Sequence, residues 1–330
     1  WLGLVGSEMC IRDRNKTYMS SARSISKFSD PKITAKGAER AWVDLTALKT
    51  LWFNTGTLCN LACENCYIES TPKNDSLVYL SISEVVEYLD EIKSEGFPTE
   101  EIGITGGEPF MNPDIISIME ECLKRGFKIL VLTNAMRPMM KCENDLLRLN
   151  RVYGNQMTVR VSVDHFKKEM HEEERGPRSW VPMMKGLVWL SENNFNIDIA
   201  GRTRWGEDEV ELRDGFLAFF KEHNISIDAH DKKQLILFPE MDENAEVPEI
   251  TTECWGILGV SPEDMMCSSS RMVVKRKEDD KPSVMACTLL AYDQQFNMGQ
   301  TLKEASKSVS LNHPHCAKFC VLGGGACSVS

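Results

Sequence analysis

Three cysteines, Cys59, Cys63 and Cys66, lie in one short loop. They follow an apolar run at residues 51–53 and a turn sequence at residues 54–56, which predicts a strand that ends at the loop. Iron–sulfur cubanes usually take four thiolates, one per iron, whereas this loop supplies three. A metal site with three protein ligands keeps one coordination position open for a substrate or cofactor. The loop therefore indicates an iron–sulfur centre with an open position, and zinc is the alternative.

A second motif, Gly106-Gly107-Glu108-Pro109, follows the next predicted strand at residues 101–105. Two adjacent glycines allow backbone conformations that side chains forbid, so a ligand can approach the chain closely. Taken alone, the tetrapeptide is also consistent with an ordinary strand-to-helix turn.

Together, the Cys-x-x-x-Cys-x-x-Cys spacing and the Gly-Gly-Glu-Pro motif resemble the radical S-adenosylmethionine (SAM) superfamily. The resemblance implies that the three cysteines are the catalytic residues and hold a [4Fe–4S] cluster whose fourth iron is chelated by SAM. It implies that Tyr67 is the aromatic residue common after the third cysteine. It also implies that residues 106–109 hold the SAM amino group.

The resemblance extends to two later strand ends. Thr133-Asn134 resembles a Thr-Asn pair of the family, and a simple turn pair is an equal interpretation. Ser162 and Asp164 share one face of a predicted strand because side chains alternate along strands. They resemble positions that contact the SAM ribose and carboxylate, and ordinary strand polarity is the alternative.

Three arginines follow these strands. Arg175 also resembles a recurring family element, and we expect it at the surface, with pairing to a carboxylate as the alternative. Arg202 and Arg204 are expected either to face substrate or the SAM carboxylate, or to be solvated at the rim.

The C-terminal part carries a second group of cysteines around a predicted hairpin at residues 273–285. The arrangement resembles the auxiliary-cluster extension called SPASM, or its shorter Twitch form. It departs from the family because Asp280-Lys281 replaces the hairpin glycine and the tail spacing is Cys-x3-Cys-x6-Cys. We expect at least one auxiliary [4Fe–4S] cluster, from Cys267 and Cys287 with two other thiols, and a zinc knuckle is the alternative. His313 and His315 are expected to be turn residues. The candidate metal ligands here are Cys254, Cys267, Cys287, Cys316, Cys320 and Cys327.

Strands are expected to alternate with helices between residues 48 and 240. This alternation predicts βαβ units and a parallel sheet. The sixth strand is predicted at either 225–229 or 235–238. Six units are too few for a closed eight-fold barrel, and the resemblance implies an α/β fold with a partial (β/α)6 TIM-like barrel and a small Cys-rich C-terminal extension. Active sites in parallel barrels lie at the C-terminal strand ends, where the motifs fall.

Composition excludes several classes of protein. The net charge of −11 argues against a nucleic-acid partner, and no apolar run is long enough to cross a membrane. Twelve cysteines in 330 residues indicate metal ligation in a reducing, cytoplasmic compartment.

Four segments are expected. Residues 1–18 resemble translated sequencing-adapter read-through, so we expect the native protein to start near Met19 and give Cys10 no role. Residues 19–47 are expected to form a lead-in and residues 48–240 the barrel. Residues 241–330 are expected to form the auxiliary-cluster region, whose end we interpret as truncated.

The resemblance implies a radical SAM enzyme. An external reductant of the flavodoxin or ferredoxin type supplies an electron, SAM is cleaved to methionine and a 5′-deoxyadenosyl radical, and the radical abstracts hydrogen from a peptide or protein side chain. One alternative is a radical SAM reaction on a small molecule in cofactor biosynthesis. Another is a non-enzymatic iron–sulfur electron carrier or a zinc-stabilised binding module.

Overall fold

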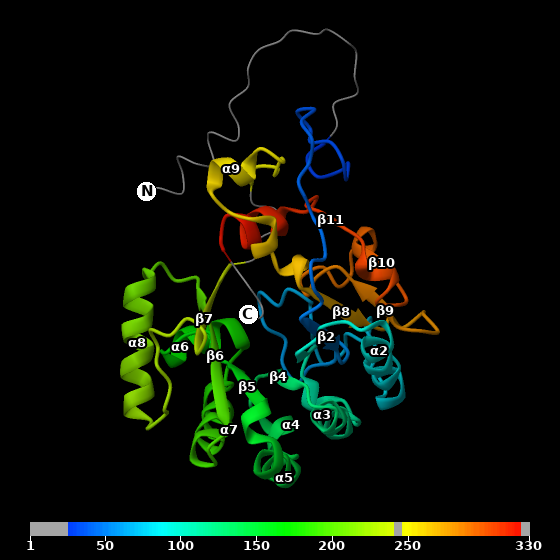
Figure 1. Ribbon diagram of the computed structural model, residues 1–330. Helices are drawn as coiled ribbons and strands as arrows, with labels where there is room; N and C mark the ends of the chain where they lie inside the picture. The colour runs from blue at the N-terminus through cyan, green and yellow to red at the C-terminus, as the bar shows by residue number, and fades with distance from the viewer. Residues whose placement is uncertain (1–25, 241–245, 325–330) are drawn as a thin grey trace. The chain divides into compact units, whose positions relative to one another are not determined.

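The computed structural model describes residues 26–240 and 246–324, which form two compact units (Figure 1). The larger unit contains residues 48–240 and 270–305. The smaller unit combines three segments, which within the described residues are 26–47, 246–269 and 306–324. The predictions for Cys10, Cys327 and residues 1–18 lie outside the described residues.

Six parallel strands form the centre of the larger unit as the structure describes it, and they lie side by side in chain order. The strands are β2 (Thr50–Asn54), β3 (Glu101–Thr105), β4 (Lys128–Thr133), β5 (Met157–Ser162), β6 (Asn196–Thr203) and β7 (Leu235–Pro239). The inner residues of β2, β3 and β4 are mostly apolar and buried, as expected for strands covered on both faces, whereas β7 is partly exposed after Leu235. Of the two ranges left open for the sixth strand, the structure has the second as a strand, and residues 225–229 are not a strand.

Helices follow the strands around the sheet in chain order (Figure 1). The first of these helices begins with a capping box, in which Ser81 accepts from the Glu84 amide and Glu84 accepts from the Ser81 amide. This helix ends at Gly96, which has a φ of 71°. The helices are α2 (Ile82–Glu95), α3 (Ile115–Lys124), α4 (Arg137–Met140), α5 (Glu143–Tyr153), α6 (Lys168–Arg175), α7 (Trp180–Glu192) and α8 (Glu209–Glu222).

The predicted hairpin exists, but it continues the barrel sheet. Strand β8 (Ser270–Val274) pairs in parallel with β2, so the sheet extends past its first strand. Strands β9 (Ser283–Met285) and β10 (Asn297–Gly299) then add in antiparallel order. Within the described residues of the larger unit, all of these strands therefore belong to one sheet of nine strands.

The smaller unit contains little regular structure. Strand β1 (Trp42–Val43) pairs with β11 (Val309–Ser310) in antiparallel order. Helix α9 (Cys254–Leu258) and a short turn of helix at Pro262–Asp264 follow the first segment. A buried ion pair of 2.5 Å joins Arg40 to Glu249 within this unit. In neither of the two described ranges is there a helix with the length and apolarity needed to span a membrane.

Candidate functional site

The cysteine loop begins where β2 ends, and it is bonded to the Gly-Gly-Glu-Pro turn through backbone groups. The Gly107 amide donates to the Gly56 carbonyl over 2.8 Å, and the Glu108 amide donates to the Leu58 carbonyl over 3.1 Å. The two motifs recognised in the sequence are therefore neighbours at the C-terminal ends of β2 and β3.

Both glycines of the turn lie against the chain's own backbone. A Cβ atom on Gly107 would lie 2.3 Å from the Leu58 carbonyl oxygen, and one on Gly106 would lie 2.6 Å from the Gly56 oxygen. Gly106 also has a φ of 143°, which side chains disfavour. The backbone before the first cysteine therefore packs where a side chain at either glycine would stand, and the predicted contact of this turn with SAM stays a prediction.

The three thiols are partly or fully covered by protein. Two backbone amides point at them: the Leu61 amide lies 3.4 Å from Cys59 Sγ, and the Ser70 amide lies 3.3 Å from Cys66 Sγ. Burial raises the pKa of Cys59 to about 12. Burial also raises the pKa of Cys63, and the positive charge of Arg175 opposes this rise. The thiols of Cys59 and Cys63 therefore hold their protons at neutral pH until a metal displaces them.

The donor set of the loop is three thiols, which is the ligand chemistry of a cubane held by three cysteines, because each thiolate of a cubane binds a different iron. Backbone amides lie beside two of these thiols, where they would donate to bound sulfur ligands.

Glu108 links the ends of β3 and β4. Its side chain is buried, and its two carboxylate oxygens accept from the Thr133 hydroxyl over 2.8 Å and from the Asn134 amide over 2.9 Å. Burial raises the pKa of Glu108 to about 7, and these hydrogen bonds oppose that rise. Pro109 begins the short turn of helix Pro109–Met111 that follows.

Asn134 continues this chain of contacts to the cysteine loop. Its side-chain amide donates to Asn60 over 3.0 Å and lies 3.9 Å from Cys59 Sγ. Thr133 and Asn134 are therefore more than a turn pair, because both contact Glu108 and one of them reaches the first thiol.

Asp164 lies between two arginines at the end of β5. It accepts from Arg202 over 3.0 Å and from Arg175 through both carboxylate oxygens. Burial alone would raise the pKa of Asp164, but the two arginine charges outweigh burial and hold the pKa below its ordinary value. The expectation of a surface Arg175 was wrong, since its side chain is 15% exposed and its carboxylate partner is the alternative that we considered.

A second buried carboxylate, Glu174, holds the part of the loop between Cys63 and Cys66. It accepts from the Asn65 amide over 3.1 Å, from the Asn65 side chain over 2.9 Å and from Arg204 over 2.6 Å. Arg202 donates to the Asn65 carbonyl over 3.2 Å. Arg202 and Arg204 thus have protein partners instead of a solvated position.

Sequence reasoning missed the roles of Glu174 and Asn65. Glu174 is the last of three consecutive glutamates, a run that by itself indicates a solvated helix face. Tyr292 was also missed, although its hydroxyl donates to the Ile68 carbonyl over 2.7 Å and so contacts the end of the cysteine loop. No local spacing signals these contacts, because their partners are far apart in the chain.

Two further predicted positions line the same region. Ser162 is partly exposed at the end of β5, two residues before Asp164. Tyr67 is 38% exposed directly after the third thiol. The predicted contacts of both residues with SAM stay predictions.

The auxiliary cysteines are divided between the two units. Cys287 belongs to the larger unit, whereas Cys254, Cys267, Cys316 and Cys320 belong to the smaller one. Cys254 begins α9 and is buried, with the Thr251 amide 3.4 Å from its Sγ. Cys316 and Cys320 lie on the single π-helical segment Cys316–Val321. The auxiliary cluster stays a prediction.

His313 lies in a bend, and His315 lies at the start of the helical stretch that leads into Cys316–Val321. The His315 amide donates to His313 Nδ1 over 3.1 Å. The expectation of turn residues is therefore wrong for His315, which is helical.

Comparison with known families gives one match. Residues 53–211 match the sequence model described as the radical SAM superfamily. The matched range contains the cysteine loop, the Gly-Gly-Glu-Pro turn and Asp164.

Two curated relatives are similar over less than half of this chain. The antilisterial bacteriocin subtilosin biosynthesis protein AlbA of Bacillus subtilis strain 168 is 33% identical over 143 residues, which are 43% of this chain and 30% of AlbA. The AdoMet-dependent heme synthase of Methanosarcina barkeri is 28% identical over 147 residues, which are 43% of this chain and 38% of that protein. The chain thus spans about a third of the length of these curated relatives.

Solved structures share the fold. Streptococcus suis SuiB bound to the precursor peptide SuiA superposes with a TM-score of 0.56 at 14% identity, covering 86% of this chain and 67% of SuiB. The protein anSMEcpe with bound AdoMet gives a TM-score of 0.56 at 16% identity, covering 78% of this chain and 76% of that protein. These similarities confirm the predicted partial barrel.

Proposed function

We propose, on the premise that residues 53–211 belong to the radical SAM superfamily, that this protein is a radical SAM enzyme that modifies a peptide. The observation that carries the proposal is the joined site, in which the cysteine loop bonds to the turn at residues 106–109 and Glu108 bonds to Thr133 and Asn134. An electron carrier would need the thiols but not this adjoining polar site.

Each part of the site has a proposed task. Cys59, Cys63 and Cys66 would hold the [4Fe–4S] cluster, which when bound supplies the electron that cleaves SAM to methionine and a 5′-deoxyadenosyl radical. Glu108 would bind the SAM amino group, because a buried carboxylate gains a partner from a cation.

The remaining contacts orient the loop and the cofactor. The Leu61 and Ser70 amides donate to the thiolates of Cys59 and Cys66 and so stabilise their charge. Asp164 holds Arg175 and Arg202 beside the loop, where we propose that the guanidinium groups attract the SAM carboxylate. Tyr67 and Ser162 are proposed to contact SAM.

Two relatives support a peptide as the substrate. AlbA is named for the biosynthesis of the bacteriocin subtilosin, and SuiB binds a precursor peptide. A small molecule is the second candidate, favoured by the similarity to a heme synthase. The proposal includes an external reductant of the flavodoxin or ferredoxin type, at least one auxiliary [4Fe–4S] cluster and a cytoplasmic location, where thiols stay reduced.

The test is release of 5′-deoxyadenosine by anaerobically reconstituted protein supplied with SAM and dithionite. The variant with Cys59, Cys63 and Cys66 all replaced by alanine should lose the product and the iron and sulfide of one cluster, while an auxiliary cluster would keep its own. Cys142→Ala, which removes a partly buried thiol beside α5, serves as the matched control and should keep both. Product release by the triple variant would refute the site, and its absence from the wild type would favour the electron carrier or binding module.

Peptides encoded beside the gene then test the substrate class. A mass change in such a peptide, seen only with SAM and reductant, supports the peptide proposal. A modified small molecule together with unmodified peptides would favour the second candidate.

A further inference from the structure

A pocket of about 350 Å³ lies within the smaller unit, and none of its lining residues is assigned above to cofactor or SAM binding. This volume is at the lower end of the range for small-ligand pockets, about 300–1,000 Å³, so it suits one side chain better than a whole cofactor. Its lining residues are Trp42, Asp44, Thr46, Thr252, Trp255, Pro262 and Glu263.

One wall comes from alternate residues of the first segment. Trp42, Asp44 and Thr46 line the pocket, whereas Val43 between them is buried. This alternation is that of an extended chain with one covered face and one open face. Trp42 is 44% exposed, so much of its indole faces the open side.

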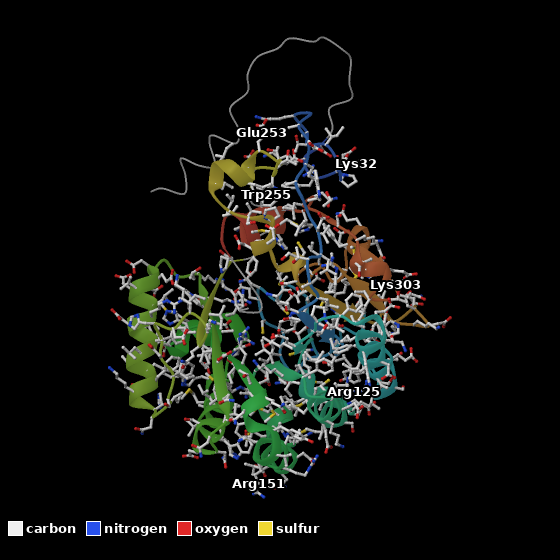
Figure 2. The ribbon with its side chains drawn as sticks, viewed as in Figure 1. Lys32, Arg125, Arg151, Glu253, Trp255 and Lys303 are labelled. Carbon is white, nitrogen blue, oxygen red and sulfur yellow. The ribbon has the colours of Figure 1, made fainter. Side chains whose placement is uncertain are left out.

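The opposite wall comes from α9 and the short turn of helix at Pro262–Asp264. Figure 2 labels Trp255 at α9, next to Glu253. Trp255 and Glu263 from this wall repeat the chemistry of Trp42 and Asp44, so each wall presents one indole and one carboxylate.

Neighbouring serines hold both carboxylates. Asp44 accepts from the Ser308 hydroxyl over 2.5 Å, and Glu263 accepts from the Ser261 hydroxyl. Such contacts limit the positions that the two charges take up.

None of the residues that line the pocket is a lysine, arginine or histidine. Indole faces attract cations, and arginine also stacks on them. Two carboxylates add a direct charge attraction. A neutral or anionic ligand would leave these charges without a complement.

From this arrangement we infer that the pocket binds a cationic side chain of a peptide, with arginine as the preferred residue. The inference rests on the proposed function in one respect: the peptide is taken to be the one that the enzyme modifies. The pocket then sets specificity by recognising a basic residue of that peptide.

The test compares two labelled pentapeptides that differ in one group. Acetyl-Gly-Gly-Arg-Gly-Gly-amide carries the guanidinium, and its citrulline analogue has nearly the same shape without the charge. Binding to the full, anaerobically reconstituted chain is measured by fluorescence anisotropy at low ionic strength. The arginine peptide should bind about tenfold more tightly than the citrulline peptide, as cation–π and carboxylate contacts together would give.

Two variants remove the discrimination by separate routes. Trp255→Leu removes one indole, and the double substitution Asp44→Asn with Glu263→Gln removes both charges with almost no change in shape. The control, Glu278→Gln with Asp280→Asn, removes the same charge from the exposed β8–β9 turn of the larger unit. The control should keep the tenfold preference and the pocket variants should lose it. If Trp255→Leu does not fold, the double variant decides.

Equal binding of the two peptides by the wild type would overturn the inference, as would a preference that survives in both pocket variants. Assay of 5′-deoxyadenosine on the same samples separates this outcome from failure of the proposed function. Release of 5′-deoxyadenosine without an arginine preference would refute the inference about the pocket and leave the proposed function unaffected. An arginine preference without release of 5′-deoxyadenosine would support the inference about the pocket and refute the proposed enzyme activity.

Discussion

Glu108 is the residue whose protonation the site must control. Its pKa is raised above the ordinary value because the carboxyl is buried, so below about pH 7 the neutral form predominates in the folded protein. A neutral carboxyl cannot pair with the SAM ammonium group. Binding of SAM should therefore require loss of a proton below this pKa.

We predict that the Kd of SAM rises about tenfold for each pH unit below 7 and is constant above it. Equilibrium dialysis of the reconstituted protein between pH 5.5 and 8.5 measures this dependence. Glu108→Gln should bind SAM more weakly at pH 8 and show a flatter profile. A wild-type profile that is flat over this range would contradict the assigned role of Glu108.

The buried carboxylate of Asp164 pairs with both Arg175 and Arg202. Glu174 lies 3.6 Å from Arg202 as a second partner. Removal of the Asp164 carboxylate leaves two largely buried charges without this partner, so Asp164→Asn should lower the free energy of unfolding by about 3 kcal/mol. Urea denaturation measures the change.

Asp145→Asn breaks an exposed pair with Arg148 and should change stability by no more than about 0.5 kcal/mol. Equal effects of the two substitutions would contradict the buried network.

At the scale of the element, the position of the cysteine loop depends on the turn at residues 106–109. Gly107→Ala places a Cβ atom against the Leu58 carbonyl. Because this carbonyl belongs to the backbone, it cannot rotate away as a flexible side chain could. The loop should move away from the turn, and the reconstituted protein should lose the iron of the cluster that the loop holds while an auxiliary cluster keeps its own. Gly256→Ala is the control, since a Cβ atom at Gly256 meets nothing within 4 Å. Full iron content in the Gly107 variant would show that the turn does not position the loop.

At the scale of the molecule, the sheet of the barrel continues past its first strand into β8, β9 and β10. Strand β8 pairs along β2 from Thr50 to Phe53, so the first barrel strand is internal to the sheet. Exposed edges of apolar strands pair with other chains and promote aggregation.

A chain shortened to end at residue 240 should therefore aggregate, because β2 becomes an uncovered edge. A chain shortened to end at residue 305 keeps β8, β9 and β10 and should stay soluble to a greater extent. Size-exclusion chromatography of both proteins measures the difference. If the two proteins elute alike as monomers, the hairpin is not required to cover β2.

Much of the site could be predicted from the sequence because its motifs are local. The spacing of Cys59, Cys63 and Cys66, the adjacent glycines and the alternation of strands with helices are all short-range patterns. Parallel connections then bring the C-terminal strand ends together, so that the proximity of Glu108 to the cysteine loop followed from topology.

The sequence by itself thus determined the parallel sheet, its motifs and the strand ends at which they meet, because spacing and periodicity act over a few residues, and the family resemblance of the motifs added the partial barrel. Only the tertiary structure decided that Asp164 pairs with Arg202, that Glu174 holds Asn65 and that β8 joins β2. The same is true of the pocket between residues 42–46 and 252–263. These contacts join elements far apart in the chain, and partners at that distance are chosen by packing and register, which no local pattern records.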